Sequence, residues 1–500
     1  MLLLGIDIGT SSVKVSVVDA DTQQCIASVQ YPETESAIIS LHPGWAEQSP
    51  DQWWEDVKQA ILKCHSSGTY DPAAIAAIGI AYQMHGLVLV DKNQHVLRNA
   101  IIWSDSRAVE TGDKAFEDIG EQLCLTHLLN SPGNFTASKL AWVKEHEPSL
   151  YEKVDKFMLP GDFIAMKMTG DSTTTTSALS EGIFWDFKEN TISEAVIDYF
   201  DFDRRLFPPV QPLFAAHGYL KENVASRLSL RTGIPVSYKA GDQLNNALSL
   251  HVMKPGEAAV NAGTSGVVYA VSDELTYDKL SRVNSFAHVN HTAGKNSIGV
   301  LLCINGCGAT NKWIRHIAGA SLSYPQMSEA AATVHAGSDG LQIIPFGNGA
   351  ERMLENKMTG AHFKNLDFGI HSPAHLFRAT QEGIAFAFRY GIDIMRENNI
   401  YLSVVRAGKA NMFLSDVFTE AFINSTGVTV ELHECDGSVG AALGAGIGAG
   451  IFTNADDAFA GRKPLKTIEP DETNQYNEWY EQWKETLSNM ITKQNELCQL

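Results

Sequence analysis

Residues 2–19 read LLLGIDIGTSSVKVSVVD, and this stretch decides the fold. Its two runs of Leu, Ile and Val predict a buried β-hairpin. A core hairpin needs neither the carboxylate of Asp7 nor the small turn Gly9-Thr10-Ser11-Ser12 between the strands. Glycine lets an anion approach backbone amides, and Thr and Ser hydroxyls add donors. The turn therefore indicates an anion site, with an ordinary hairpin turn as the alternative.

The same pattern returns at residues 257–272, which read EAAVNAGTSGVVYAVS. An apolar strand, the turn Gly263-Thr264-Ser265-Gly266 and a Val-rich strand follow in the same order. Two copies some 255 residues apart indicate duplicated domains and not a solenoid. Two such turns across a cleft would hold a polyphosphate from both sides, and Asp7 could hold a Mg²⁺ that bridges it.

The domain boundary is expected near residues 240–256, which divides the chain into domains 1–243 and 244–500. A chain of 500 residues exceeds the size of one compact core, which agrees with this division. Periodicity predicts further strands at 25–31, 75–83, 87–93, 285–290 and 298–304, a helix after Ser49, helical structure over 307–334 and a terminal helix from 474. The glycine- and alanine-rich segment 439–450 predicts a helix whose small face packs against a neighbouring helix or a nucleotide.

Composition and charge narrow the classes of partner. The net charge of −20 argues against nucleic acid and anionic membranes. No apolar run reaches the roughly 20 residues of a membrane span, and no signal peptide is visible, so a cytoplasmic protein is expected. Seven cysteines indicate free thiols, and the Cys303–Cys307 pair lacks the second pair of ligands that a zinc site needs. The sequence leaves a homodimer open.

A second carboxylate lies where a strand passes into a helix. In PVSYKAGDQLNNALSL (235–250), Asp242 follows the apolar strand close to the expected boundary. A carboxylate at that place can accept a proton from a substrate hydroxyl as a general base. A helix N-cap is the alternative, since Asp also favours that position.

Polar and aromatic groups end two further strands, AYQMHG (81–86) and IIWSDSRA (101–108). A sugar requires hydrogen-bonding side chains around its hydroxyls and an aromatic wall for its C–H faces. The polar candidates are Gln83, His85, Asp105 and Arg107, and Trp103 is the candidate wall.

Several motifs occur in order from residue 3 to about 450: GIDIGTSSVKV, WAEQSPDQWW, QMHG, WSDSR, GNFTASKLAWVKEHEP, AGDQ and NAGTSGVVYAV. Together they resemble the FGGY family of carbohydrate kinases, specifically the xylulose kinases. The resemblance implies an α/β fold of two duplicated actin-like, ribonuclease-H-like domains that flank a catalytic cleft. It also implies ATP and Mg²⁺ between the domains, a pentulose deeper in the cleft and phosphate transfer to D-xylulose.

The resemblance and the strand-end positions described above together suggest roles for individual residues. Asp242 is expected to deprotonate the sugar hydroxyl, and Asp7 to place the phosphates, with both carboxylates near the metal. The sugar-binding residues are Gln83, Met84, His85, Trp103, Asp105, Asp242 and Gln243. The nucleotide-binding residues are Gly9, Thr10, Ser11 and Lys14 in the first domain, and Gly263, Thr264, Ser265, Gly306, Asn311, Gly408, Lys409 and Asn411 in the second.

The chain departs from the family pattern at three places. Gln243 stands where the family usually has Asn, PFGNGAER (345–352) replaces a P-Y-L-x-G-E-R form, and the segment around 406–411 lacks two glycines. Kinases for ribulose, fuculose or gluconate are therefore the nearest alternatives to a xylulose kinase. A non-catalytic sugar sensor on the same scaffold is a further alternative.

Overall fold

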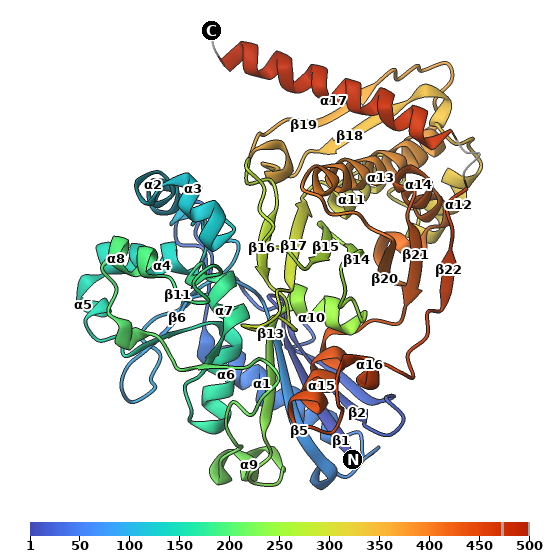
Figure 1. Ribbon diagram of the computed structural model, residues 1–500. Coiled ribbons are helices and arrows are strands. Elements are labelled where there is room, and N and C mark those ends of the chain that lie inside the picture. The colour runs from blue at the N-terminus through green and yellow to red at the C-terminus, as the bar shows by residue number, and fades with distance from the viewer. Residues whose placement is uncertain (472–474, 499–500) are drawn as a thin grey trace.

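Two β-sheets organise the computed structural model, which describes residues 1–471 and 475–498 (Figure 1). The first sheet has the order β13-β5-β1-β2-β3 and the second has the order β16-β17-β15-β14-β20-β21-β22. The strands of the first sheet are β1 (Leu2–Ile8), β2 (Val13–Asp19), β3 (Cys25–Tyr31), β5 (Ile75–Tyr82) and β13 (Val236–Gly241). Those of the second are β14 (Glu257–Ala262), β15 (Gly266–Ser272), β16 (Asn284–Ala287), β17 (Ile298–Ile304), β20 (Val404–Gly408), β21 (Thr429–His433) and β22 (Lys466–Ile468).

Both sheets share one core topology. In each, three antiparallel strands that are neighbours in the sheet (β1-β2-β3 and β14-β15-β17) are followed by two strands parallel to the first (β5 and β13, β20 and β21). The spatial order is 3-2-1-4-5 in both sheets, with β16 and β22 added at the edges of the second. The prediction of a duplicated α/β fold is therefore confirmed.

The predicted opening hairpin forms as expected. Leu2 pairs with Asp19 and Ile8 with Val13, and almost every residue of both strands is buried. The predicted strands 25–31 and 298–304 coincide with β3 and β17. The strand expected at 87–93 is shorter because the Asp91 carboxylate accepts hydrogen bonds from two following amides and starts a turn.

The helical stretch expected over 307–334 is broken in two. Helix α11 (Gly308–Ala318) ends before Gly319, and Ser323 begins α12 (Tyr324–Ala332) with a capping box. The helix expected after Ser49 is α1 (Pro50–His65), with the Ser49 hydroxyl as its N-cap.

Helix α15 (Gly437–Gly448) lies on the first sheet although it belongs to the end of the chain. Figure 1 shows this red helix beside the blue strands β1 and β2. A Cβ on Gly5 would lie 1.7 Å from the Ser438 carbonyl oxygen, and one on Gly79 would lie 1.9 Å from that of Ala441. The small residues thus allow helix and strand backbones to touch. The expected close approach to a neighbouring helix is found at Gly440, where a Cβ would lie 1.7 Å from Ser249 Oγ on α10 (Asp242–Ser249), and contact with a nucleotide stays a prediction.

The remaining elements complete the two lobes. The other helices are α2 (Val109–Ile119), α3 (Glu121–Leu123), α4 (Thr136–His146), α5 (Pro148–Tyr151), α6 (Pro160–Thr169), α7 (Thr176–Glu181), α8 (Glu194–Phe200), α9 (Glu222–Leu228), α10 (Asp242–Ser249), α13 (Pro373–Glu397), α14 (Asp416–Thr426), α16 (Ala455–Ala458) and α17 (Tyr476–Cys498). The short strands are β4 (Glu47–Gln48), β6 (Val88–Val90), β7 (Ala100–Ile101), β8 (Lys156–Met158), β9 (Thr174–Thr175), β10 (Trp185–Asp186), β11 (Thr191–Ile192), β12 (Val210–Gln211), β18 (Gln342–Phe346) and β19 (Gly360–Lys364).

The predicted terminal helix is α17, whose expected first residue, 474, lies outside the described residues. Its Trp483 indole donates to the Ile343 carbonyl at 2.8 Å and anchors the helix on β18. Over residues 1–471 and 475–498, no helix is long and apolar enough to span a bilayer. The cysteines whose side chains the structure describes are free: Cys25, Cys64, Cys124, Cys303, Cys307 and Cys435. Among the described residues, no group of three His, Cys, Asp or Glu side chains could hold a metal.

Candidate functional site

The site is built at one edge of the first sheet, where three parallel strands end side by side. Strand β5 lies between β1 and β13, and Tyr82 pairs with both Ile8 and Gly241. Neighbouring strands are about 4.8 Å apart. Asp7, the turn after β5 and Asp242 therefore meet at the carboxyl ends of these strands, the usual ligand position of an open α/β sheet.

The two carboxylates interact electrostatically. Burial raises the pKa of Asp242 to about 7, and the charge of Asp7 adds to the increase, while the amide groups of Gln243 partly oppose it. Burial, and then the charge of Asp436, raise the pKa of Asp7 to about 6. A carboxylate with a pKa near neutrality is suited to accept a proton at physiological pH.

The first small turn is held by a polar network. The Trp103 indole donates to the Thr10 hydroxyl at 2.9 Å, and that hydroxyl donates to Gln83 Oε1 at 3.3 Å. Gln83 Nε2 in turn donates to Gln48 Oε1 at 3.0 Å. Gln83 is buried and both ends of its amide are engaged within the protein, so it supports the turn; its contact with a sugar stays a prediction.

The other predicted residues of the first turn lie around Asp7. Lys14 lies on β2 opposite Asp7 in the backbone register of the hairpin. Its ammonium lies 3.5 Å from the Asp436 carboxylate. Asp436 caps α15, and a Cβ on the next residue, Gly437, would lie 2.2 Å from Asp7 Oδ2. The sequence motifs did not indicate Asp436 as a site residue, although Asp is among the preferred N-cap residues of a helix.

His85 occupies the turn between β5 and β6 with a left-handed φ of +61°. Its Nδ1 donates to the Glu181 carbonyl at 2.9 Å, which leaves Nε2 as an acceptor in the neutral ring. Burial and the charge of Lys139 lower the pKa of His85 to about 3. The ring contacts Phe135 of the first lobe and Phe286 of the second, so it lies where the lobes meet.

Met84 and Gln243 flank the proposed base. A Cβ on Gly241 would lie 2.6 Å from Met84 Cγ and 2.7 Å from Glu181 Oε2. The Gln243 side chain donates to Asp242, and its buried Oε1 has no hydrogen-bond partner within the described residues. Glu181, buried and with a pKa raised well above its usual range by burial, is a site residue that no sequence motif indicated.

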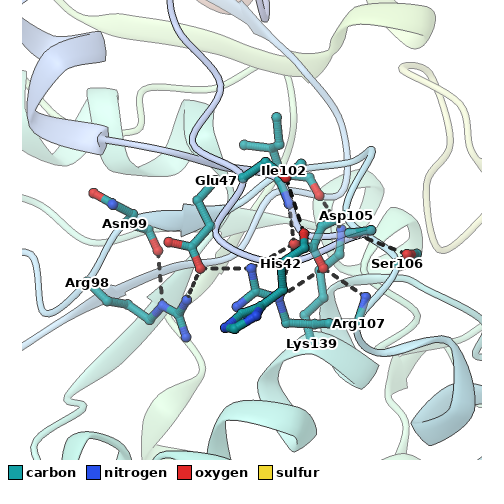
Figure 2. Close-up of polar contacts among 12 residues, drawn as sticks. His42, Glu47, Arg98, Asn99, Ile102, Asp105, Ser106, Arg107 and Lys139 are labelled. Carbon is teal, nitrogen blue, oxygen red and sulfur yellow. Dashed lines mark hydrogen bonds and ion pairs between the residues drawn. The ribbon is translucent and has the colours of Figure 1, made fainter.

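Asp105 is fully buried and binds protein groups. Its carboxylate accepts the Ala46 amide at 2.6 Å and pairs with the Arg107 guanidinium at 2.7 Å (Figure 2). Arg107 also pairs with Glu47 and stacks 3.7 Å from the Trp45 ring. Asp105 thus braces the loop that carries Trp103, a half-exposed side chain, and direct contact of Asp105 with a sugar stays a prediction.

The second small turn opens into a cavity of about 400 Å³ in the second lobe. The amides of Gly308 and Ala309, at the start of α11, donate to the carbonyls of Gly263 and Thr264 at 2.9 and 3.0 Å. The cavity lining includes four of the predicted nucleotide residues: Gly263, Thr264, Asn311 and Asn411. Gln381 also lines it and was missed.

The remaining predicted nucleotide residues lie outside this lining. Gly306 donates its amide to Glu351 at 3.0 Å, and its close contact with the Pro345 carbonyl leaves no room for a Cβ. Gly408 is the last residue of β20, and the amide of the next residue, Lys409, donates to the His433 carbonyl. Ser265 lies within the second small turn, between β14 and β15. Roles for these four residues stay predictions.

The chemistry of the strand-end groups fits a hard cation. Asp7 and Asp242 supply carboxylate oxygens, the ligands that Mg²⁺ prefers. Asp7 Oδ2 faces the start of α15 and is not engaged in any hydrogen bond among the described residues. These two residues could therefore hold a magnesium ion.

Comparisons with known proteins agree with this geometry. Residues 2–249 match the N-terminal domain, and residues 258–451 the C-terminal domain, of the FGGY family of carbohydrate kinases. The chain is 29% identical to the xylulose kinase of Escherichia coli K12 over 94% of this chain and 93% of the relative. It is 30% identical to that of Klebsiella pneumoniae over 89% and 88%.

Among solved structures, the xylulose kinase from Rhodospirillum rubrum superposes with a TM-score of 0.88 at 23% identity. That superposition covers 98% of this chain and 99% of the other and shows the same fold. With both family domains matched in order over most of its length, this chain belongs to the FGGY family of carbohydrate kinases.

Proposed function

We propose that the protein transfers the γ-phosphoryl group of ATP to a hydroxyl of a ketopentose, with the 5-hydroxyl of D-xylulose as the first candidate. The observation that carries this proposal is the convergence of Asp7, His85 and Asp242 at the ends of β1, β5 and β13. The names of the xylulose kinases that the chain resembles support the choice of sugar.

In this mechanism Asp242 accepts the proton of the attacking hydroxyl. Its raised pKa keeps it basic enough to take the proton near pH 7, and the Gln243 side chain orients its carboxylate. His85 Nε2 accepts a hydrogen bond from another sugar hydroxyl, because Nδ1 is committed as a donor to Glu181.

The nucleotide occupies the cavity of the second lobe with its phosphates toward the two small turns. Backbone amides of the two small turns stabilise the charge that spreads over the transferring group, whereas the Gly308 and Ala309 amides of α11 are already bonded to the second turn. A magnesium ion at Asp7 and Asp242 would neutralise phosphate charge. Phe286 of the second lobe already contacts His85, so closure of the lobes on a sugar would exclude competing water.

A panel of carbohydrates with coupled detection of ADP tests the proposal. D-xylulose should give the highest kcat/KM, above ribulose, fuculose, gluconate and glycerol. The Asp242→Asn variant should lose at least ~10²-fold in kcat but retain nucleotide binding in a separate titration. A higher kcat/KM for another member would reassign the substrate, and near-normal turnover by the variant would reject the base.

A further inference from the structure

A buried ammonium group lies directly under the turn that carries His85. Lys139 is on α4, has no exposed surface, and donates from Nζ to the His85 carbonyl at 2.9 Å and to the Ile102 carbonyl at 3.0 Å. These carbonyls belong to two separate loops, one after β5 and one after β7. Figure 2 shows Lys139 beside Ile102 and Asp105.

The charge of Lys139 has no carboxylate directly against it. Within the described residues no carboxylate oxygen lies within 4 Å of its Nζ, whereas the equally buried Lys239 pairs with Asp162 at 2.6 Å. Burying a charge without a direct counter-ion is costly, and burial lowers the pKa of Lys139 to about 7 although the charges of Asp105 and Glu181 act against this. The two carbonyl contacts therefore compensate for the burial of the Lys139 side chain, which joins the loops that carry His85 and Ile102.

Helix α4 holds His85 from two directions. Phe135, which precedes the helix, places its ring 4.8 Å from the imidazole, and Lys139 one turn later binds the His85 carbonyl. A non-glycine residue at a φ of +61° persists only where its surroundings fix it. The Lys139 contact fixes the backbone on the carbonyl side, and the Nδ1 contact with Glu181 fixes the ring.

We propose that Lys139 is a positioning residue of the sugar site. It ties the His85 turn to the loop that carries Trp103, and so holds the ring where Nδ1 donates to the Glu181 carbonyl and Nε2 is left as an acceptor for a sugar hydroxyl. Lys139 does not contact the substrate itself. The inference rests on the proposed function, since it assigns His85 to sugar binding.

The Lys139→Met variant tests the contact because Met has similar length and no donor. We expect the Kd for the best sugar of the panel to rise at least ~10-fold, while the Kd for ATP changes less than ~2-fold. Lys144→Met is the matched control: Lys144 is on the same helix and donates to the Phe200 carbonyl at 3.0 Å and to Asp201, away from the site. It should leave both constants unchanged.

A second pair of measurements separates positioning from general stability. In a His85→Ala background, Lys139→Met should change the sugar Kd less than ~2-fold, because its effect passes through His85. In ¹⁵N spectra of the sugar-free protein, the His85 Nδ1–H signature should be present in the wild type and lost in Lys139→Met. Lys139→Leu, which also lacks a donor, replaces the Met variant in all of these measurements if the Met variant does not fold.

Three results would overturn the inference: an unchanged sugar Kd in Lys139→Met, an equal loss of affinity with and without His85, or an unaltered His85 tautomer. The tautomer measurement needs no sugar. If no member of the panel is phosphorylated, the proposed function fails, but the spectra still decide the role of Lys139.

Discussion

The contact between α15 and the first sheet predicts that Gly79→Ala damages both stability and activity. The added Cβ would lie 1.9 Å from the Ala441 carbonyl oxygen, and ordinary contact begins at 3.4 Å. The obstructing atom belongs to backbone, so no side-chain rotation relieves the clash. Helix α15 must move away from β5 by about 1.5 Å.

That displacement reaches the site because α15 begins there. The Asn245 side chain donates to the Gly437 carbonyl at 2.8 Å, and Gly437 lies against the Asp7 carboxylate. A shift of this size breaks the hydrogen bond and alters the surroundings of Asp7. Overpacking costs about 1–3 kcal/mol and the lost hydrogen bond about 1 kcal/mol, so the total is about 2–4 kcal/mol.

Thermal unfolding and a coupled ADP assay measure the two effects. At about 2–4 °C per kcal/mol for a lobe of this size, Tm should fall by roughly 4–16 °C. Misplacement near 1 Å should lower kcat at least ~10-fold. Gly294→Ala is the matched control, since its added Cβ meets nothing within 4 Å. A Gly79→Ala protein with a Tm within 1 °C of wild type and normal kcat would refute the reasoning.

Three further predictions follow from buried charges. Because Asp242 must be ionised to act as a base and its pKa is raised to about 7, kcat/KM should fall below about pH 7 in a pH–rate profile. Burial raises the pKa of Glu351 to about 7, so the native state binds its proton more tightly than the unfolded chain. The free energy of unfolding should therefore decrease from about pH 4.5 to about pH 7, and decrease less in Glu351→Gln, as measured by urea unfolding. Arg107→Lys loses the stack on Trp45 and the planar contact with Asp105, and should lower stability by about 2 kcal/mol with little change in the KM for ATP.

Local patterns in the sequence were sufficient to predict the hairpins, whereas anion binding at their turns stays a prediction. The two apolar runs in residues 2–19 predict β1 and β2, and the return of the pattern at 257–272 predicts β14 and β15. The family motifs also placed Gly263, Thr264, Asn311 and Asn411 in one region, and all four line the cavity of the second lobe.

Contacts between distant segments could not be predicted in this way. The side chains on one face of α15 are small because this face meets β1 and β5, which lie more than 350 residues earlier in the chain. Composition alone does not identify these strands as its partner. Asp105 illustrates the same limit. Its position at a strand end predicts exposure to ligand, but its carboxylate is occupied by Arg107, two residues further along the chain, and by the Ala46 amide, which the tertiary fold brings to it.

Two helices that run between the lobes determine the position of the Asp242 carboxylate relative to that of Asp7. Helix α10 begins with Asp242 and leads toward the second sheet, and α15 returns from it to lie beside Asp7. The helices contact each other through the Asn245–Gly437 hydrogen bond and through Gly440, where a Cβ would lie 1.7 Å from Ser249 Oγ. Because one tightly packed pair carries the surroundings of both carboxylates, we infer that lobe closure leaves their separation unchanged. In the proposed mechanism, Asp242 and Asp7 then form a preorganised unit, and closure of the lobes has only to bring the nucleotide phosphates to these two carboxylates.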